Sequence, residues 1–89
     1  MRRVAVTGMG IISPIGQSVN SFWQALTAGE CGIGPITRLD VSAYKVKIAA
    51  EVKEFDPTQH GMDVPTARRL DLFAQYAMAA AHQAMAQSG

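Results

Sequence analysis

The sequence has few charged residues, a single cysteine and no long apolar run. Only 17% of its 89 residues are charged, against about 25% in average soluble domains. A short chain exposes much of its surface and needs polar side chains to cover it. With 48% hydrophobic residues, the chain is predicted to have part of its surface covered by more of the same polypeptide or by a partner subunit.

The other absences exclude several classes of protein. Cys31 is the only cysteine, so an internal disulfide framework and a multi-cysteine metal site are excluded. No stretch approaches the roughly 20 apolar residues of a membrane span, and glycine and proline interrupt the N-terminal apolar segment too often for a signal peptide. A net charge of +1 gives no reason to expect nucleic-acid or membrane binding. We therefore predict a cytoplasmic protein.

The residues that are present predict a strand, a helix, a second strand and a second helix. The centre of residues 3–7 is consecutively apolar, as in a parallel strand covered on both faces. Residues 19–28 carry an apolar stripe at helical spacing, between a capping Ser18 and a terminating Gly29. Residues 47–52 alternate weakly, which predicts a short, half-exposed strand.

The last predicted helix covers residues 66–87, with Thr66 as its cap and Gly89 beyond its end. Its alanines occur on all sides of the axis, which is typical of a helix that packs on more than one face. The chain supplies too few elements to surround such a helix, and residues 32–44 are predicted to be a loop. We therefore predict an α/β fold that is incomplete as a free domain, with no boundary inside residues 1–89.

A glycine pair after the first strand raises the question of nucleotide binding. The dinucleotide fingerprint needs a third glycine three residues after Gly10, where this sequence has Ser13 followed by Pro14. The next helix begins only at residue 19, so its N-terminus is not placed to bind a pyrophosphate. We infer that Gly8 and Gly10 allow a tight turn and close backbone packing. A nucleotide-binding module is kept as a minor alternative.

Arg68 and Arg69 are predicted to lie in or just before the first turn of the long helix. The helix dipole disfavours cations there, whereas two arginines beside free backbone N–H groups form a surface suited to anions. Two interpretations stay open: an anion-binding pair, or two solvated arginines whose charge Asp71 partly offsets. Asp71 is itself expected to form an ion pair with Arg68, three residues earlier.

Cys31, His60 and His82 form no recognisable catalytic arrangement. Cys31 follows a helix C-terminus, where the helix dipole disfavours the thiolate that a nucleophile requires. The two histidines are far apart in the sequence, and nothing connects them to the cysteine. We predict no catalytic, cofactor-binding or metal-binding residue in this chain.

Several segments together resemble the N-terminus of the beta-ketoacyl-acyl-carrier-protein synthases, most closely the type II enzymes. They occur in the same order along essentially the whole chain: Arg3 to Gly10 (RVAVTGMG), Ser13 to Gly16 (SPIG), Phe22 to Leu26 (FWQAL), Ala28-Gly29, Gly32-Ile33, Asp40, Ser42 to Tyr44, Phe55-Asp56, Arg68 to Asp71 (RRLD), Phe73 and Gln75 to Ala77. The resemblance implies a thiolase-like layered αβαβα fold, of which the chain would be the N-terminal strand-helix-strand-helix portion.

The resemblance also implies a function. Enzymes of this family are homodimers that join an acyl group to malonyl-acyl-carrier protein by decarboxylative Claisen condensation in fatty acid biosynthesis, without a cofactor. Their nucleophilic cysteine belongs to a Thr-Ala-Cys-Ser-like motif that Cys31 does not match, and the assisting histidines lie further on. The chain is thus expected to be part of an acyltransferase and inactive alone. A non-catalytic homologue, like the chain-length partner of polyketide synthases, shares this N-terminus and remains an alternative.

One functional feature of the family falls within the chain. In type II synthases, basic residues at the start of the last predicted helix contact the acidic face of acyl-carrier protein. Arg68 and Arg69 match two of these residues, while Pro65 replaces a third. The resemblance therefore implies that Arg68 and Arg69 bind acyl-carrier protein.

Overall fold

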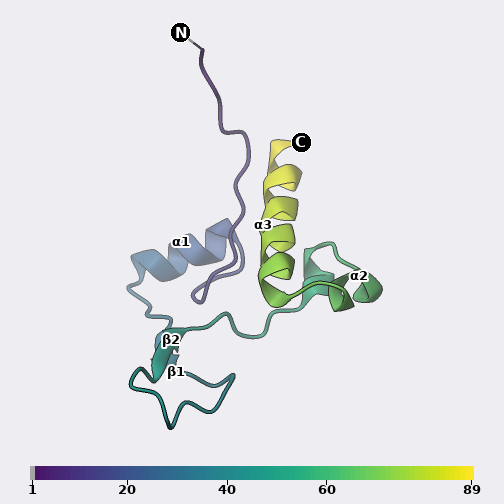
Figure 1. Ribbon diagram of the computed structural model, residues 1–89. Helices are drawn as coiled ribbons and strands as arrows, with labels where there is room; N and C mark the ends of the chain where they lie inside the picture. The colour runs from purple at the N-terminus through teal and green to yellow at the C-terminus, as the bar shows by residue number, and fades with distance from the viewer. Residues whose placement is uncertain (1) are drawn as a thin grey trace.

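The computed structural model describes residues 2–89, which form an open arrangement of helices above one short hairpin (Figure 1). The radius of gyration is 15.7 Å, whereas a compact domain of this length has about 12 Å. The buried apolar side chains among the described residues are few and mostly small: Ala25, Met62, Ala67 and Ala79. This mixed set of helices and strands, without a core of large side chains, confirms the prediction of a partial α/β fold.

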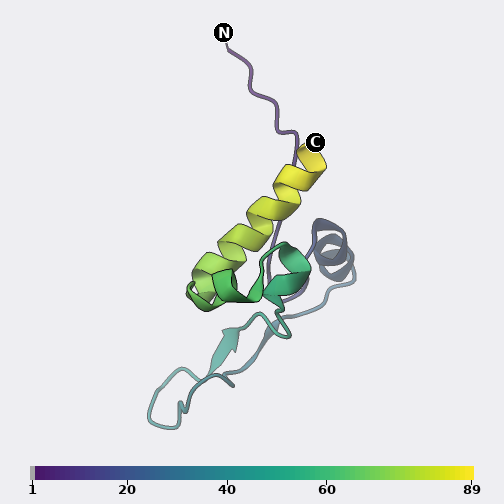
Figure 2. The ribbon, with the colours of Figure 1, turned by 90° about the vertical axis from the view of Figure 1, so that its right-hand side faces the viewer.

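The N-terminal segment runs extended beside α3 (Leu72–Ser88) and in the opposite direction, and its first residues project beyond the end of that helix (Figures 1 and 2). The prediction of a strand over residues 3–7 is wrong here, because the segment pairs with no strand among residues 2–89. Val4 is 92% exposed and Val6 79% exposed. A strand needs a neighbour for its backbone hydrogen bonds, and the described residues provide none at this position.

The glycine pair lies where the N-terminal segment crosses α3. A β-carbon at Gly8 would lie 2.1 Å from the carbonyl oxygen of Ala84, so only a residue without one fits. The inferred close backbone packing is therefore confirmed. The inferred tight turn is instead found later, where the backbones of Ser13 and Gly16 exchange hydrogen bonds of 2.9 and 3.3 Å.

Helix α1 (Val19–Thr27) confirms the first predicted helix. The Ser18 hydroxyl accepts a hydrogen bond from the Ser21 N–H, and the Ser21 hydroxyl accepts one from the Ser18 N–H, forming a capping box. Gly29 follows the helix with φ 76°, a left-handed conformation that glycine adopts at little cost. Both ends of this helix are therefore fixed by neighbouring residues.

Strands β1 (Ile33–Pro35) and β2 (Ile48–Ala50) pair as an antiparallel hairpin. β2 confirms the strand predicted over residues 47–52, in a shorter form. β1 corrects the prediction of an uninterrupted loop over residues 32–44. Pro35 has no N–H to donate, but a proline is tolerated at the end of an edge strand, so pairing with β2 overrides the local turn signal.

The helix predicted over residues 66–87 is two helices. A one-turn 3₁₀ helix, η1 (Pro57–His60), leads into α2 (Val64–Arg68), and α3 follows after a break. The cap is Asp63 rather than Thr66, because the Asp63 carboxylate accepts the Thr66 N–H at 2.8 Å.

The break between α2 and α3 has an identifiable cause. The side-chain amide nitrogen of Gln75 donates to the carbonyl oxygens of Ala67 at 3.0 Å and Leu70 at 3.1 Å. In a continuous helix these oxygens would accept backbone N–H groups four residues later. Asp71 adopts an extended conformation, with φ −66° and ψ 160°, and becomes the N-cap residue of α3.

Candidate functional site

The structure places Arg68 in the last turn of α2 and Arg69 at its C-cap, and both are exposed. They are predicted in or just before the first turn of one long helix; the structure instead has them at the C-terminal end of a separate short helix, with α3 beginning at Leu72. Cations are favoured near a helix C-terminus, so the helix dipole gives these arginines no need of an anionic partner. The remaining physical basis for an anion site is two adjacent exposed guanidinium groups on the turn between α2 and α3.

Buried side chains lie beneath this turn, and the carboxylates of Asp63 and Asp71 lie before and after the arginines in the sequence. Ala67 is 6% exposed and Met62 5% exposed, so α2 rests on buried contacts beside the arginines. Hydrogen bonds from the Thr66 side chain and backbone lower the pKa of Asp63, which stays ionised at neutral pH. The expected ion pair between Asp71 and Arg68 is not found within residues 2–89, where Asp71 serves as the N-cap of α3.

A second polar cluster connects the hairpin to α3, and no local pattern in the sequence predicts it. The Glu51 carboxylate is buried and accepts hydrogen bonds from the Thr37 hydroxyl at 2.8 Å and from the Thr37 and Arg38 N–H groups. These bonds, chiefly that from the Thr37 side chain, lower the pKa of Glu51. The Arg38 guanidinium donates to the Tyr76 hydroxyl at 2.9 Å and to the Val52 carbonyl oxygen.

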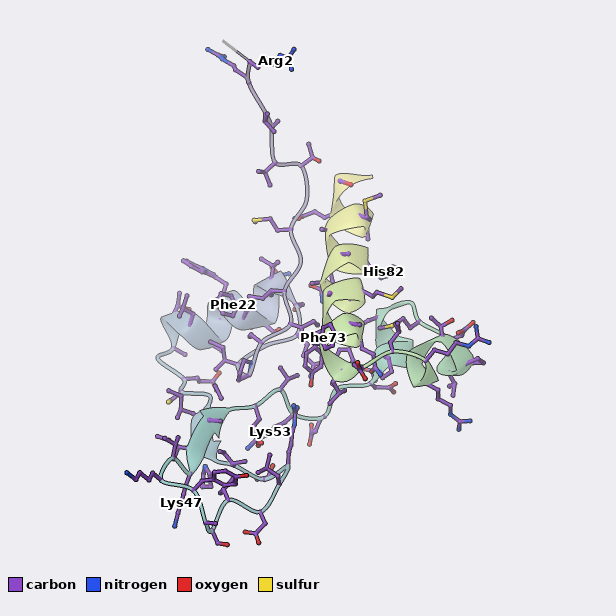
Figure 3. All side chains as sticks on the ribbon, viewed as in Figure 1. Arg2, Phe22, Lys47, Lys53, Phe73 and His82 are labelled. Atoms are coloured by element: carbon purple, nitrogen blue, oxygen red, sulfur yellow. The ribbon has the colours of Figure 1, made fainter. Side chains whose placement is uncertain are left out.

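His82 packs against Gly61, the residue that follows His60, so the two histidines lie in the same part of the structure. Both make packing or hydrogen-bond contacts there. The His60 ring stacks on Phe55 at 5.3 Å between centroids, and its Nε2 lies 3.3 Å from the Gln17 side-chain oxygen. His82, labelled on α3 in Figure 3, packs on Gly61, whose β-carbon would lie 2.6 Å from the imidazole Cε1. Cys31 is exposed in the segment between α1 and β1. No contact among the described residues joins this cysteine to either histidine.

The surroundings of the glycine pair do not suit a phosphate. The space beside Gly8 and Gly10 is filled by the carbonyl oxygens of Ala84 and Ala80. These oxygens carry partial negative charge, whereas phosphate cradles are built from backbone N–H groups. The carbonyl oxygens give a physical reason against the nucleotide-binding alternative.

Residues 2–89 contain neither a metal-binding cluster nor a membrane-spanning helix. No group of three or more histidine, cysteine, aspartate or glutamate side chains is arranged to hold a metal ion there. In the same range, no helix is long and apolar enough to cross a membrane. Figure 3 shows that Lys47, on the hairpin, points away from the rest of the chain.

Comparison with known proteins identifies the family. Residues 1–89 match the family described as beta-ketoacyl synthase, N-terminal domain. The chain belongs to the beta-ketoacyl synthase family. This confirms the resemblance predicted from the ordered sequence segments.

Curated relatives are similar to this chain over 94–99% of its length. The chain is 49% identical over 88 residues to the 3-oxoacyl-[acyl-carrier-protein] synthase 2 of Coxiella burnetii, covering 99% of this chain and 21% of that protein. It is 48% identical to the protein of the same name from Vibrio cholerae, with the same coverage, and 46% identical over 84 residues to that of Synechocystis, covering 94% of this chain and 20% of that protein. The chain therefore spans about a fifth of the length of these relatives.

A solved structure shows the same local architecture. The structure described as the ishigamide ketosynthase/chain length factor superposes with a TM-score of 0.86 at 40% sequence identity, over 99% of this chain and 22% of that chain. The open arrangement in Figure 1 is therefore that of the matched part of this ketosynthase/chain length factor structure, which confirms the prediction of a partial thiolase-like α/β fold.

Proposed function

We propose that the chain is the N-terminal part of a 3-oxoacyl-acyl-carrier-protein synthase acting in the cytoplasm in fatty acid biosynthesis. The observation that carries the proposal is the 45–49% identity, along nearly the whole chain, to proteins that bear this name. In the reaction, malonyl-acyl-carrier protein loses carbon dioxide and its α-carbon forms a bond to the acyl carbon, whose thioester bond breaks. The catalytic residues lie in other parts of the complete enzyme, so residues 1–89 alone are inactive.

A condensation assay tests this proposal. The complete synthase is incubated with acyl- and malonyl-acyl-carrier protein, and the carrier-protein thioesters are identified by mass spectrometry. The expected product is 3-oxoacyl-acyl-carrier protein, with one carbon dioxide released per condensation and no product from residues 1–89 alone. Absence of condensation by the complete protein would contradict the proposal.

A non-catalytic homologue is the second candidate, because the solved structure that resembles this chain is described as a ketosynthase/chain length factor. The two candidates differ in one intermediate. A synthase takes the acyl group from its carrier onto a cysteine, which leaves a mass increase on the protein, whereas a chain-length-factor-like protein does not. The synthase is favoured by two segments that match the pattern typical of the fatty acid synthases of this family, Ser13-Pro14 and Arg68 to Asp71.

We also propose that Arg68 and Arg69 bind the acidic face of acyl-carrier protein in the complete enzyme. Both side chains are exposed to solvent, whereas the preceding residue, Ala67, is buried against the rest of the chain. The two charges are therefore accessible on a turn that is held by packing. Replacing both by alanine is expected to raise the KM for acyl-carrier-protein substrates about tenfold, since each charged contact contributes roughly 0.5–1 kcal/mol. An unchanged KM would rule out this docking role.

The exposed apolar side chains are proposed to be covered in the complete homodimer. Val4, Val6, Trp23 and Phe73 are 92%, 79%, 61% and 75% exposed, and so many large apolar side chains in contact with water are typical of surfaces that a partner covers. In this proposal residues 1–89 have no internal boundary and pack as one part of the larger domain. Sedimentation of the complete synthase at twice the monomer mass is the expected result.

A further inference from the structure

Gln75 makes an unusual pair of contacts just behind the two arginines. Its single amide nitrogen donates to the carbonyl oxygens of Ala67 and Leu70, at 3.0 and 3.1 Å. These oxygens lie immediately before Arg68 and immediately after Arg69. Because both hydrogen bonds come from one planar amide, they fix the positions of the two carbonyl groups relative to α3.

The contacts determine which backbone conformation carries the arginines. The residue pattern predicts one uninterrupted helix over residues 66–87, and the structure instead has a break at residues 69–71. The Gln75 amide donates to both oxygens. The Ala67 oxygen also accepts the Leu70 N–H at 3.2 Å, from three residues later instead of the four of a continuous helix. Without the Gln75 amide, the segment is expected to move toward the continuous helix, which would turn Arg68 and Arg69 to other directions.

We infer that Gln75 is a positioning residue for the carrier-protein interface: its side-chain amide holds the turn that presents Arg68 and Arg69. The inference rests on the proposed docking function of those two arginines. Gln75 is half-buried behind the turn and is not itself expected to contact the carrier protein. Its role is to fix the backbone that carries the pair before binding, so that less conformational entropy is lost when the partner docks.

The test uses the complete synthase with Gln75→Met, which keeps the length of the side chain and removes the donor. The KM for acyl-carrier protein is expected to rise about threefold to tenfold, because the turn that carries the two arginines must then be ordered when the carrier protein binds, while kcat stays unchanged. Gln87→Met is the matched control: it lies on the same helix, and its side chain contacts Met9 instead. The control is expected to leave this KM unchanged.

A double-mutant cycle distinguishes positioning from a general loss of stability. In a synthase that already carries Arg68→Ala and Arg69→Ala, Gln75→Met is expected to cause no further rise in KM. An additive effect would overturn the inference, as would a KM within twofold of wild type for Gln75→Met in the otherwise unchanged enzyme.

Three further outcomes are distinguished by these variants. If Gln75→Met does not fold, Gln75→Asn replaces it; this variant keeps an amide that is too short to reach both oxygens, and the same criteria apply. If the arginine double variant has an unchanged KM, the docking proposal and the inference both fail. If only the Gln75 variant has an unchanged KM, docking stands and the inference alone is wrong.

Discussion

The β-carbon that Gly10 lacks would lie 2.0 Å from the backbone carbonyl oxygen of Ala80. The N-terminal segment and α3 therefore approach each other backbone to backbone, with no side chain between them. Two glutamines of the same helix continue the contact: Gln87 accepts the Met9 N–H at 2.7 Å, and Gln83 accepts the Ile11 N–H at 3.0 Å. The first and last parts of the chain are joined by this contact.

Gly10→Ala is expected to destabilise the protein by about 1–3 kcal/mol, the usual cost of forcing an extra carbon into a filled space. The nearest atom is a helix carbonyl oxygen, which cannot move without distorting α3. Gly34→Ala is the control, because a β-carbon there meets nothing within 4 Å. The free energies of unfolding of the two variants in denaturant provide the comparison. Equal values would show that the segment does not lie on α3.

Gln83→Ala is expected to cost about 1–3 kcal/mol of unfolding free energy, because partly buried backbone groups lose their partners. The Gln83 side chain bonds both backbone groups of Ile11 and also the Gln17 carbonyl oxygen, at 2.6 Å. Gln87→Ala removes one exposed hydrogen bond and is expected to cost less than about 1 kcal/mol. If both variants lose the same stability, the account of Gln83 as the main connection is wrong.

Glu51 is expected to make stability depend on pH in the acidic range. Its folded-state pKa is lowered below 4.5, first by the Thr37 side-chain hydrogen bond. This contribution is therefore fully present above the unfolded-state pKa and is lost as the pH falls through the folded-state pKa. Glu51→Gln should flatten the unfolding free energy measured between about pH 3 and pH 6. The exposed Glu54→Gln serves as the control, and an identical profile for both variants would contradict the account.

Tyr76→Phe is expected to loosen the hairpin from α3 while leaving the aromatic contacts in place. The ring of Tyr76 keeps its edge contact with Phe55, at 4.8 Å between centroids, and only the hydroxyl that accepts from Arg38 is lost. Hydrogen exchange of the β1–β2 amides should become faster, and exchange within α1 should not change. Unchanged exchange in the hairpin would mean that Arg38 does not connect it to α3.

Local signals in the sequence were enough for some elements. Ser18 and Gly29 define the ends of α1 because a side-chain cap and a left-handed glycine act on adjacent backbone groups. The glycine pair also predicted close packing, although not the helix it packs on. The family was identified correctly from short motifs in a fixed order.

The errors come from contacts between distant residues. Gln75 divides the long helix by bonding carbonyl groups five and eight residues away, and helical periodicity carries no information about such a bond. β1 forms because β2 is available to pair with it. The strand predicted over residues 3–7 has no partner within the described residues. The position of Arg68 and Arg69 at the end of α2, rather than at the start of α3, follows from the same break.

The central claim, a synthase that binds its carrier protein through Arg68 and Arg69, is tested most directly by comparing two acyl donors. The complete enzyme and its Arg68→Ala/Arg69→Ala variant condense malonyl-acyl-carrier protein, held at saturation, with either an acyl-carrier protein or the same acyl group on pantetheine. The variant is expected to lose about tenfold in kcat/KM with the carrier-protein donor and to react normally with the pantetheine donor. Equal losses with both donors, or no loss with either, would contradict the account.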